Sequence, residues 1–154
     1  FSKLAKTSNM FNQLLKIALS DFWAANEDRN ANNSNLLYDI TNTSLVPIDF
    51  GCILNSADFD FSMMQLTSTE TILNSPLFRY LVQNVSEKSM QELRDYYNVC
   101  LSRCHLQVNS IIEDLPSDWG IPAKVVSCKL SQLFEPNWTE AVWNNFEECL
   151  NDNI

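Results

Sequence analysis

The chain has 154 residues, of which 45% are hydrophobic and 19% charged, and its formal net charge is −9. This size is enough for one domain with a buried core. The acidic balance argues against nucleic acid as a direct ligand, because such binding depends on clustered Lys and Arg. No apolar run approaches the ~20 residues of a membrane span. Five cysteines, an odd number, favour a reducing compartment. We therefore expect no membrane contact and a cytoplasmic location.

The first predicted element is an amphipathic helix over residues 4–25, which no proline or glycine interrupts. Its apolar residues recur at helical spacing: Phe11, Leu14, Leu15, Ala18 and Phe22. The helix leads into residues 26–35, where five of ten positions are asparagine. Asparagine side chains bond to nearby backbone groups and favour turns over helix. We expect an irregular polar loop there.

Two short strands are predicted next, Leu36–Tyr38 and Leu45–Ile48, joined by residues 39–44 into a hairpin. Three hydrophobic residues and a proline precede Asp49, so we expect this aspartate to close a buried strand. Gly51 follows where the backbone must swing away from the strand.

The segment 56–75 is rich in Ser and Thr. Its hydroxyls are candidate phosphorylation sites, but capping explains several of them better. Thr67 and Glu70 fit a capping box, and Ser75 followed by Pro76 fits a helix start.

The remainder is helical in pattern, with predicted helices at about 76–84, 89–115, 122–134 and 138–150. Ser89 is the predicted cap of the second of these, which also carries Cys100, Cys104 and His105. A structural zinc site usually needs four ligands, so packing is the preferred role for these three. The predicted fold class is mainly α with a small β-hairpin (α+β).

Two short motifs, Asn26–Asn30 and Pro47–Gly51, carry the predicted chemistry. Phosphoryl transfer needs an aspartate beside the attacking hydroxyl, and a carboxylate and an amide oxygen that hold Mg²⁺. Asp28 is the candidate catalytic aspartate, although an ion pair with Arg29 is the alternative for it. Asp49 is the candidate metal ligand. Asn33 and Asn35 are both candidates for binding the cofactor, and Asn35 is the preferred second metal ligand because it adjoins the first strand.

Three segments resemble the catalytic core of HipA-like kinases, namely Phe22–Asn30, Asn35–Tyr38 and Leu45–Gly51. The Asp-Arg-Asn and Ile-Asp-Phe-Gly runs are also similar to the motifs of lipid kinases. The strong resemblance covers roughly residues 21–55, and beyond it only a helical lobe is similar. The resemblance implies the helical C-terminal lobe of a protein-kinase-like fold. It also implies ATP and Mg²⁺ as cofactors and a protein Ser or Thr hydroxyl as phosphate acceptor.

The only two glycines, Gly51 and Gly120, lie after Asp28. A complete kinase has a Gly-rich loop upstream of its catalytic loop. We therefore expect the N-terminal lobe that grips ATP to lie outside this chain, on a longer polypeptide or as a separate small-lobe partner. The chain alone should be inactive or nearly so.

The whole of 1–154 is expected to be one kinase-like lobe. It would comprise a helix (1–25), the catalytic loop, hairpin and Asp-Phe-Gly element (26–55), an activation-like segment (56–75) and a helical bundle (76–154). Two other interpretations stay open. One is a noncatalytic interaction module or pseudokinase in a regulatory complex of the toxin–antitoxin kind, and the other is a small-molecule or lipid phosphotransferase using the same residues.

Overall fold

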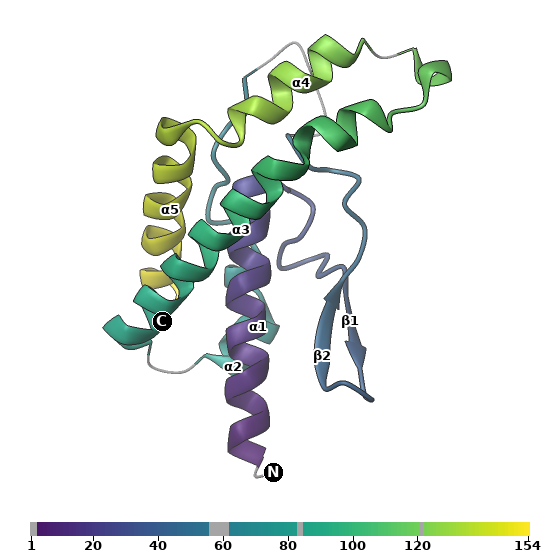
Figure 1. Cartoon of the computed structure of the whole chain (residues 1–154). Helices are drawn as coiled ribbons and strands as arrows, with labels where there is room; N and C mark the ends of the chain where they lie inside the picture. The colour runs from purple at the N-terminus through teal and green to yellow at the C-terminus, as the bar shows by residue number, and fades with distance from the viewer. Residues whose placement is uncertain (1–2, 56–61, 83–84, 121) are drawn as a thin grey trace. The chain divides into compact units, whose positions relative to one another are not determined.

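A computed structural model describes residues 3–55, 62–82, 85–120 and 122–154 (Figure 1). The elements are α1 (Lys3–Ala24), β1 (Leu36–Asp39), β2 (Ser44–Pro47), η1 (Ile72–Asn74), α2 (Pro76–Leu81), α3 (Glu87–Glu113), η2 (Ser117–Trp119), α4 (Ala123–Gln132) and α5 (Pro136–Asn151). Within these ranges the chain is mainly helical with one small antiparallel sheet. This confirms the predicted fold class.

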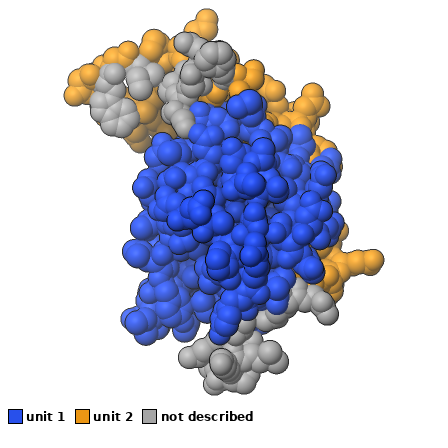
Figure 2. Space-filling model, turned by 180° about the vertical axis from the view of Figure 1, so that it is seen from behind, with its two compact units in different colours: residues 1–58, 63–84, 141–154 blue, residues 59–62, 85–140 orange. Residues whose placement is uncertain are grey.

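The chain divides into two compact units, coloured separately in Figure 2. The first comprises residues 1–58, 63–84 and 141–154, and the second residues 59–62 and 85–140. Helix α5 contributes residues to both units. The expectation of a single lobe over 1–154 stays a prediction.

Helix α1 supplies the core of the first unit. The predicted apolar stripe is buried along its length, from Phe11 to Phe22. The ring of Phe22 meets Phe146 of α5 edge-on, with ring centroids 5.6 Å apart, and Phe11 lies 5.7 Å from Phe78 of α2. Aromatic pairs at these separations add to the stability that burial provides. The core therefore fixes α1, whose C-terminal end leads into the predicted catalytic loop.

The hairpin lies beside α1 in the first unit (Figure 1). Strand β1 pairs with β2 in the register Leu36 to Pro47. The Gln13 side chain of α1 accepts a hydrogen bond from Leu45 N at 2.7 Å and donates to Thr43 O at 3.4 Å, which attaches the hairpin to the helix.

The opposite face of the hairpin is open. Leu37 and its register partner Val46 are 56% and 39% exposed. The expectation that Asp49 closes a buried strand is therefore wrong. A two-stranded ribbon packs one face on its helix and leaves alternate side chains on the other face in solvent.

The predicted cap at Ser75 is confirmed. Ser75 Oγ accepts from Phe78 N at 3.1 Å, with Pro76 at the start of α2. The Glu70 carboxylate accepts from Thr67 N at 2.8 Å and from Thr67 Oγ1 at 2.7 Å, but this pair caps no helix. The next helical turn, η1, is capped by Thr71, whose side chain accepts from Leu73 N at 3.2 Å.

The predicted cap at Ser89 is wrong. Helix α3 begins earlier, at Glu87, because the Ser86 side chain accepts from Ser89 N at 3.2 Å and places Ser89 inside the first turn. Residues 56–61, the first part of the activation-like segment, lie outside the described residues, as do 83–84 at the end of the predicted 76–84 helix.

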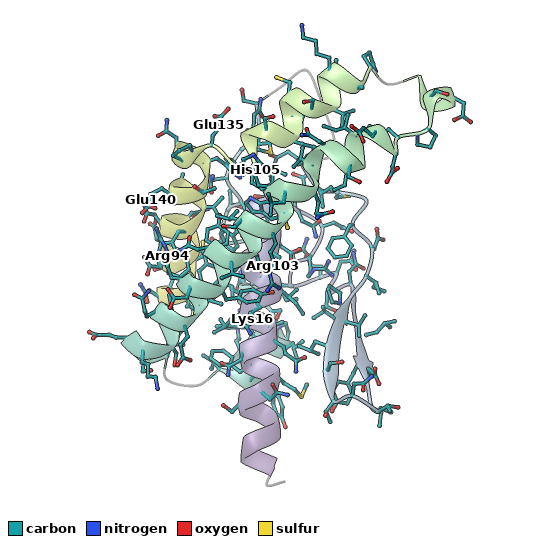
Figure 3. All side chains as sticks on the ribbon, viewed as in Figure 1. Lys16, Arg94, Arg103, His105, Glu135 and Glu140 are labelled. Atoms are coloured by element: carbon teal, nitrogen blue, oxygen red, sulfur yellow. The ribbon has the colours of Figure 1, made fainter. Side chains whose placement is uncertain are left out.

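The second unit contains α3, α4 and the start of α5. Arg94 and Glu140, labelled in Figure 3, form an ion pair at 2.5 Å. Tyr97 OH donates to Thr139 O at 3.4 Å, and burial raises the pKa of Tyr97. His105 stacks on Phe134 with ring centroids 4.7 Å apart. None of the helices in the described ranges combines the length and the apolar character that crossing a lipid bilayer requires.

Candidate active site

The loop that carries Asp28 begins with a left-handed cap at the end of α1. Ala25 has φ +49°, which turns the chain out of the helix. Its N–H donates to Phe22 O at 3.3 Å, and Asn26 N donates to Asp21 O at 2.9 Å. These bonds satisfy carbonyl groups that the helix end would leave without partners. The cap sends the loop back across the last turn of α1.

A buried ion pair anchors the loop to that turn. The Asp21 carboxylate accepts from Arg29 Nε at 2.9 Å and from Asn26 Nδ2 at 2.8 Å. None of the three residues is more than 2% exposed. Burial raises the pKa of Asp21 from its ordinary 3.8 to about 6, although Arg29 and the Asn26 hydrogen bond act to lower it. Asp21 therefore provides the negative charge beside which the Arg29 guanidinium is buried.

The other end of Arg29 joins the two predicted motifs. Its Nη1 donates to the carbonyl oxygens of Asn35, of Ile48 at 3.1 Å and of Ser34 at 3.4 Å. Ile48 N also donates to Asn35 O at 2.9 Å. The Phe50 ring lies over the guanidinium, 5.1 Å from its centre. One side chain thus bonds to the backbone of both the asparagine-rich loop and the Ile-Asp-Phe-Gly run.

Asp28 is at the centre of a second set of contacts. Its Oδ2 accepts from Asn33 Nδ2 and Asn35 Nδ2, both at 3.0 Å. The structure thereby brings together three of the predicted site residues. The alternative in which Asp28 pairs with Arg29 is wrong, because the carboxylate that Arg29 binds belongs to Asp21.

Asn30 holds the loop in shape. Its Oδ1 accepts from Asn32 N at 3.0 Å and from Asn33 N at 3.3 Å, and its Nδ2 donates to Glu27 O at 3.2 Å. Its own N–H donates to Asn33 O at 2.9 Å. These local bonds explain why an asparagine-rich run forms this turn instead of extending α1.

Asp49 lies at the exit of the hairpin with φ +55° and an exposed side chain. Its Oδ1 accepts from Gly51 N at 3.2 Å. A Cβ atom at position 51 would lie 3.2 Å from that oxygen, so glycine leaves room for the carboxylate. Beyond it, Leu54 N donates to Ala24 O at 2.7 Å, which returns the chain to the end of α1.

Cys52 lies close to the carboxylates of both motifs. Partial burial raises the pKa of its thiol, and the negative charges of Asp28, Glu27 and Asp49 raise it further. The charges of both predicted site aspartates, Asp28 and Asp49, therefore act on the Cys52 thiol. Their backbones are linked as well, because Ile48, which precedes Asp49, bonds to Asn35, whose side chain bonds to Asp28.

The side chains of this loop and of the hairpin exit are of the types that bind Mg²⁺ together with phosphate. In the part of the chain that the structure describes, no group of three or more His, Cys, Asp or Glu could hold a metal. Mg²⁺ in phosphoryl-transfer sites, however, needs only one or two protein carboxylates and takes its other oxygen ligands from phosphate and water. Asp49 offers such a carboxylate. Asn33 and Asn35 give their amide nitrogens to Asp28, so that each amide oxygen remains as a hard acceptor.

Sequence reasoning missed the role of Asp21, although a signal was present. Asp21 lies seven residues after Leu14 and three after Ala18, which places an acidic side chain on the apolar stripe of α1. A carboxylate at such a position needs a buried partner. Arg29 lies within a short loop of it and was the available cation.

A family model described as HipA-like kinase matches residues 3–148, which is nearly the entire chain. No curated protein and no solved structure matches it. The chain belongs to the HipA-like kinase family.

Proposed function

We propose that this chain carries the hydroxyl-orienting and metal-binding side of an ATP- and Mg²⁺-dependent kinase that phosphorylates a Ser or Thr hydroxyl of a protein. The observation that supports it best is the link between Asp28 and Asp49. Asn35 bonds to Asp28 through its side chain and to Ile48 through its backbone. Through Asn35, the proposed catalytic carboxylate of Asp28 is thus linked to Ile48, the residue before the proposed metal ligand Asp49.

In this proposal, the Asp28 carboxylate accepts a hydrogen bond from the hydroxyl group that receives the phosphate. Two amide groups hold its Oδ2, which fixes the orientation of the carboxylate before substrate binds. Its other oxygen is then available to accept a hydrogen bond from the hydroxyl and to take its proton as the phosphoryl group is transferred. Positioning of this kind is a large part of what a kinase contributes.

Asp49 and Asn35 would hold Mg²⁺, with Asn33 as the alternative amide ligand. When bound, the ion neutralises charge on the transferring phosphate. Asp49 has a left-handed backbone, and its carboxylate accepts a hydrogen bond from Gly51 N. Its exposure leaves it accessible to phosphate oxygens.

The family supports a kinase, and we extend it to a protein acceptor and a regulatory protein partner. A lipid or small-molecule acceptor would use the same Asp28 and Asp49. The acceptor is therefore tested separately from the site. Transfer of labelled phosphate from ATP to protein would be compared with transfer to lipid vesicles in the presence of the same enzyme.

The site is tested in the full-length protein by two variants and a matched control. Asp28→Asn should lower phosphoryl transfer by about 10²–10⁴-fold and preserve the thermal stabilisation by Mg-ATP. Asp49→Asn should abolish that stabilisation. Asp152→Asn changes an exposed aspartate beyond α5 and should alter neither. Wild-type activity in both site variants, or a wild-type protein that Mg-ATP does not stabilise, would overturn the proposal.

A further inference from the structure

We infer that Arg29 is a positioning residue that fixes the backbone of both predicted metal ligands, Asn35 and Asp49, and thereby sets the affinity of the site for Mg²⁺. This inference rests on the proposed function. It concerns a side chain that touches neither nucleotide nor hydroxyl in the proposed roles.

Both metal ligands have an unusual backbone conformation. Asn35 has φ +43° and Asp49 has φ +55°. Residues with a Cβ adopt this left-handed region at a cost, although Asn and Asp do so more readily than others. Such conformations persist when the surrounding structure holds them, and they are concentrated at functional sites. The contacts that hold Asn35 and Asp49 in this conformation therefore bear on the function of the site.

Arg29 makes those contacts. One of its nitrogens, Nη1, donates to the carbonyl of Asn35 and to the carbonyl of Ile48, the peptide group that leads directly into Asp49. The bond from Ile48 N to Asn35 O closes the arrangement, since the same Asn35 oxygen accepts from both. A shift of either left-handed residue would break a bond to the same guanidinium.

The shape of arginine suits this task and that of lysine does not. The planar guanidinium presents donors along separate directions. Nε is used toward Asp21 at 2.9 Å, while Nη1 faces the backbone carbonyls. A lysine ammonium is one nitrogen at the end of a flexible chain and cannot occupy both places. Conservation of charge at position 29 is therefore not enough to keep the geometry.

Burial makes the arrangement rigid. Arg29 is fully buried, so water cannot readily replace a lost carbonyl contact. Asp21 supplies the opposite charge and is itself held by Asn26. Phe50 covers the guanidinium from one side. The last turn of α1, which packs in the core of the first unit, thus determines where the two metal ligands lie.

Loss of a side chain that orients metal ligands typically lowers metal affinity by about 10–100-fold. In the full-length protein, we therefore expect Arg29→Lys and Arg29→Met to raise by at least tenfold the Mg²⁺ concentration that gives half of the ATP-induced thermal stabilisation. Arg29→Lys serves as the variant that keeps the charge beside Asp21. A merely structural residue would lower the melting temperature without moving this half-saturation.

The control is a core variant of matched stability. Phe78→Leu changes a fully buried ring of the first unit that packs on Phe11, far from the loop, and should lower the melting temperature without altering the Mg²⁺ half-saturation. A second measurement needs no nucleotide. Hydrogen exchange at the Ile48 amide, which bonds to Asn35 O, should be faster in the Arg29 variants and unchanged in the control beyond its global loss of stability.

The outcomes separate the two proposals. If wild type shows no Mg²⁺-dependent ATP binding, the proposed function fails. If wild type binds and the Arg29 variants keep the wild-type half-saturation, or Phe78→Leu shifts it equally, the positioning role of Arg29 fails while the site stands. Should Arg29→Met not fold, Arg29→Lys decides between these results.

Discussion

Arg29 Nη1 lies 3.1 Å from the carbonyl oxygen of Ile48, a residue 19 positions further along the chain. This contact joins the loop after α1 to the exit of the hairpin, and it is made inside the protein by a fully buried cation. The two short motifs by which the sequence resembles a kinase are therefore one structural unit.

Arg29→Met should destabilise the folded chain. The substitution removes the partner of Asp21 and the donor to three backbone carbonyls. Loss of one member of a buried ion pair costs about 3–5 kcal/mol. Urea unfolding followed by circular dichroism measures it at pH 7. The loss should be smaller at pH 5, where the isolated Asp21 carboxyl can take up a proton, and an equal loss at both pH values would contradict the role of Asp21.

Asp21 should make stability depend on pH. Its pKa is about 6 in the folded chain and near 3.8 when unfolded, so the folded state holds a proton that the unfolded state releases between these values. Its stabilising contribution is complete below about pH 3.8 and disappears as the pH rises through 6. A shift of this size corresponds to roughly 3 kcal/mol.

The matched variant for this measurement is Asp21→Asn, which cannot titrate. The free energy of unfolding of wild type minus that of the variant should increase as the pH falls from about 7 to 4. A constant difference across that range would mean that Asp21 does not retain its proton in the folded chain.

Gly51→Ala should mainly weaken Mg-ATP binding, whereas Gly120→Ala should mainly lower stability. A Cβ at position 51 would lie 3.2 Å from Asp49 Oδ1, so the carboxylate must shift by a few tenths of an ångström. We expect weaker Mg²⁺-dependent ATP binding with little loss of stability. Gly120 has φ +68° and open space around it, so alanine there should cost about 1 kcal/mol and leave binding unchanged. Titration of Mg-ATP and thermal unfolding of both variants would show whether the two effects separate.

Phe22→Ala should affect both stability and the site. The Phe22 ring is fully buried, packs edge-on against Phe146 and adjoins Asp21 in α1. Truncation of a buried phenylalanine costs about 3–5 kcal/mol. Thermal unfolding measures the loss. Phe11→Ala, in the same helix but further from the loop, should destabilise comparably with a smaller change in Mg²⁺ half-saturation.

The sequence was sufficient wherever a local rule decides the structure. The 3.6-residue spacing in α1, the paired strands and the cap at Ser75 needed only neighbouring residues. The cluster of Asp28, Asn33 and Asn35 also forms within one loop, which explains why its members could be named in advance. Their catalytic and metal-binding roles remain predictions.

The features that the sequence did not predict correctly have three separate causes. The exposure of the strand before Asp49 depends on how many layers cover the hairpin, and a run of apolar residues does not state that number. The start of α3 at Glu87 depended on a choice between Ser86 and Ser89 as cap, both of which have the chemistry for it. The Asp21–Arg29 pair required knowing that the loop folds back onto α1, a tertiary contact that no single segment contains.

The position of Cys52 makes the site observable without labelled substrate. Alkylation of a thiol proceeds through its thiolate, so its rate follows the local electrostatic potential. Occupation of the site by Mg²⁺ would offset the negative charges of Asp28 and Asp49 that now hold the Cys52 proton in place. The rate at Cys52, read by mass spectrometry relative to that of exposed Cys128, then becomes a reporter of metal occupancy that the native chain already carries.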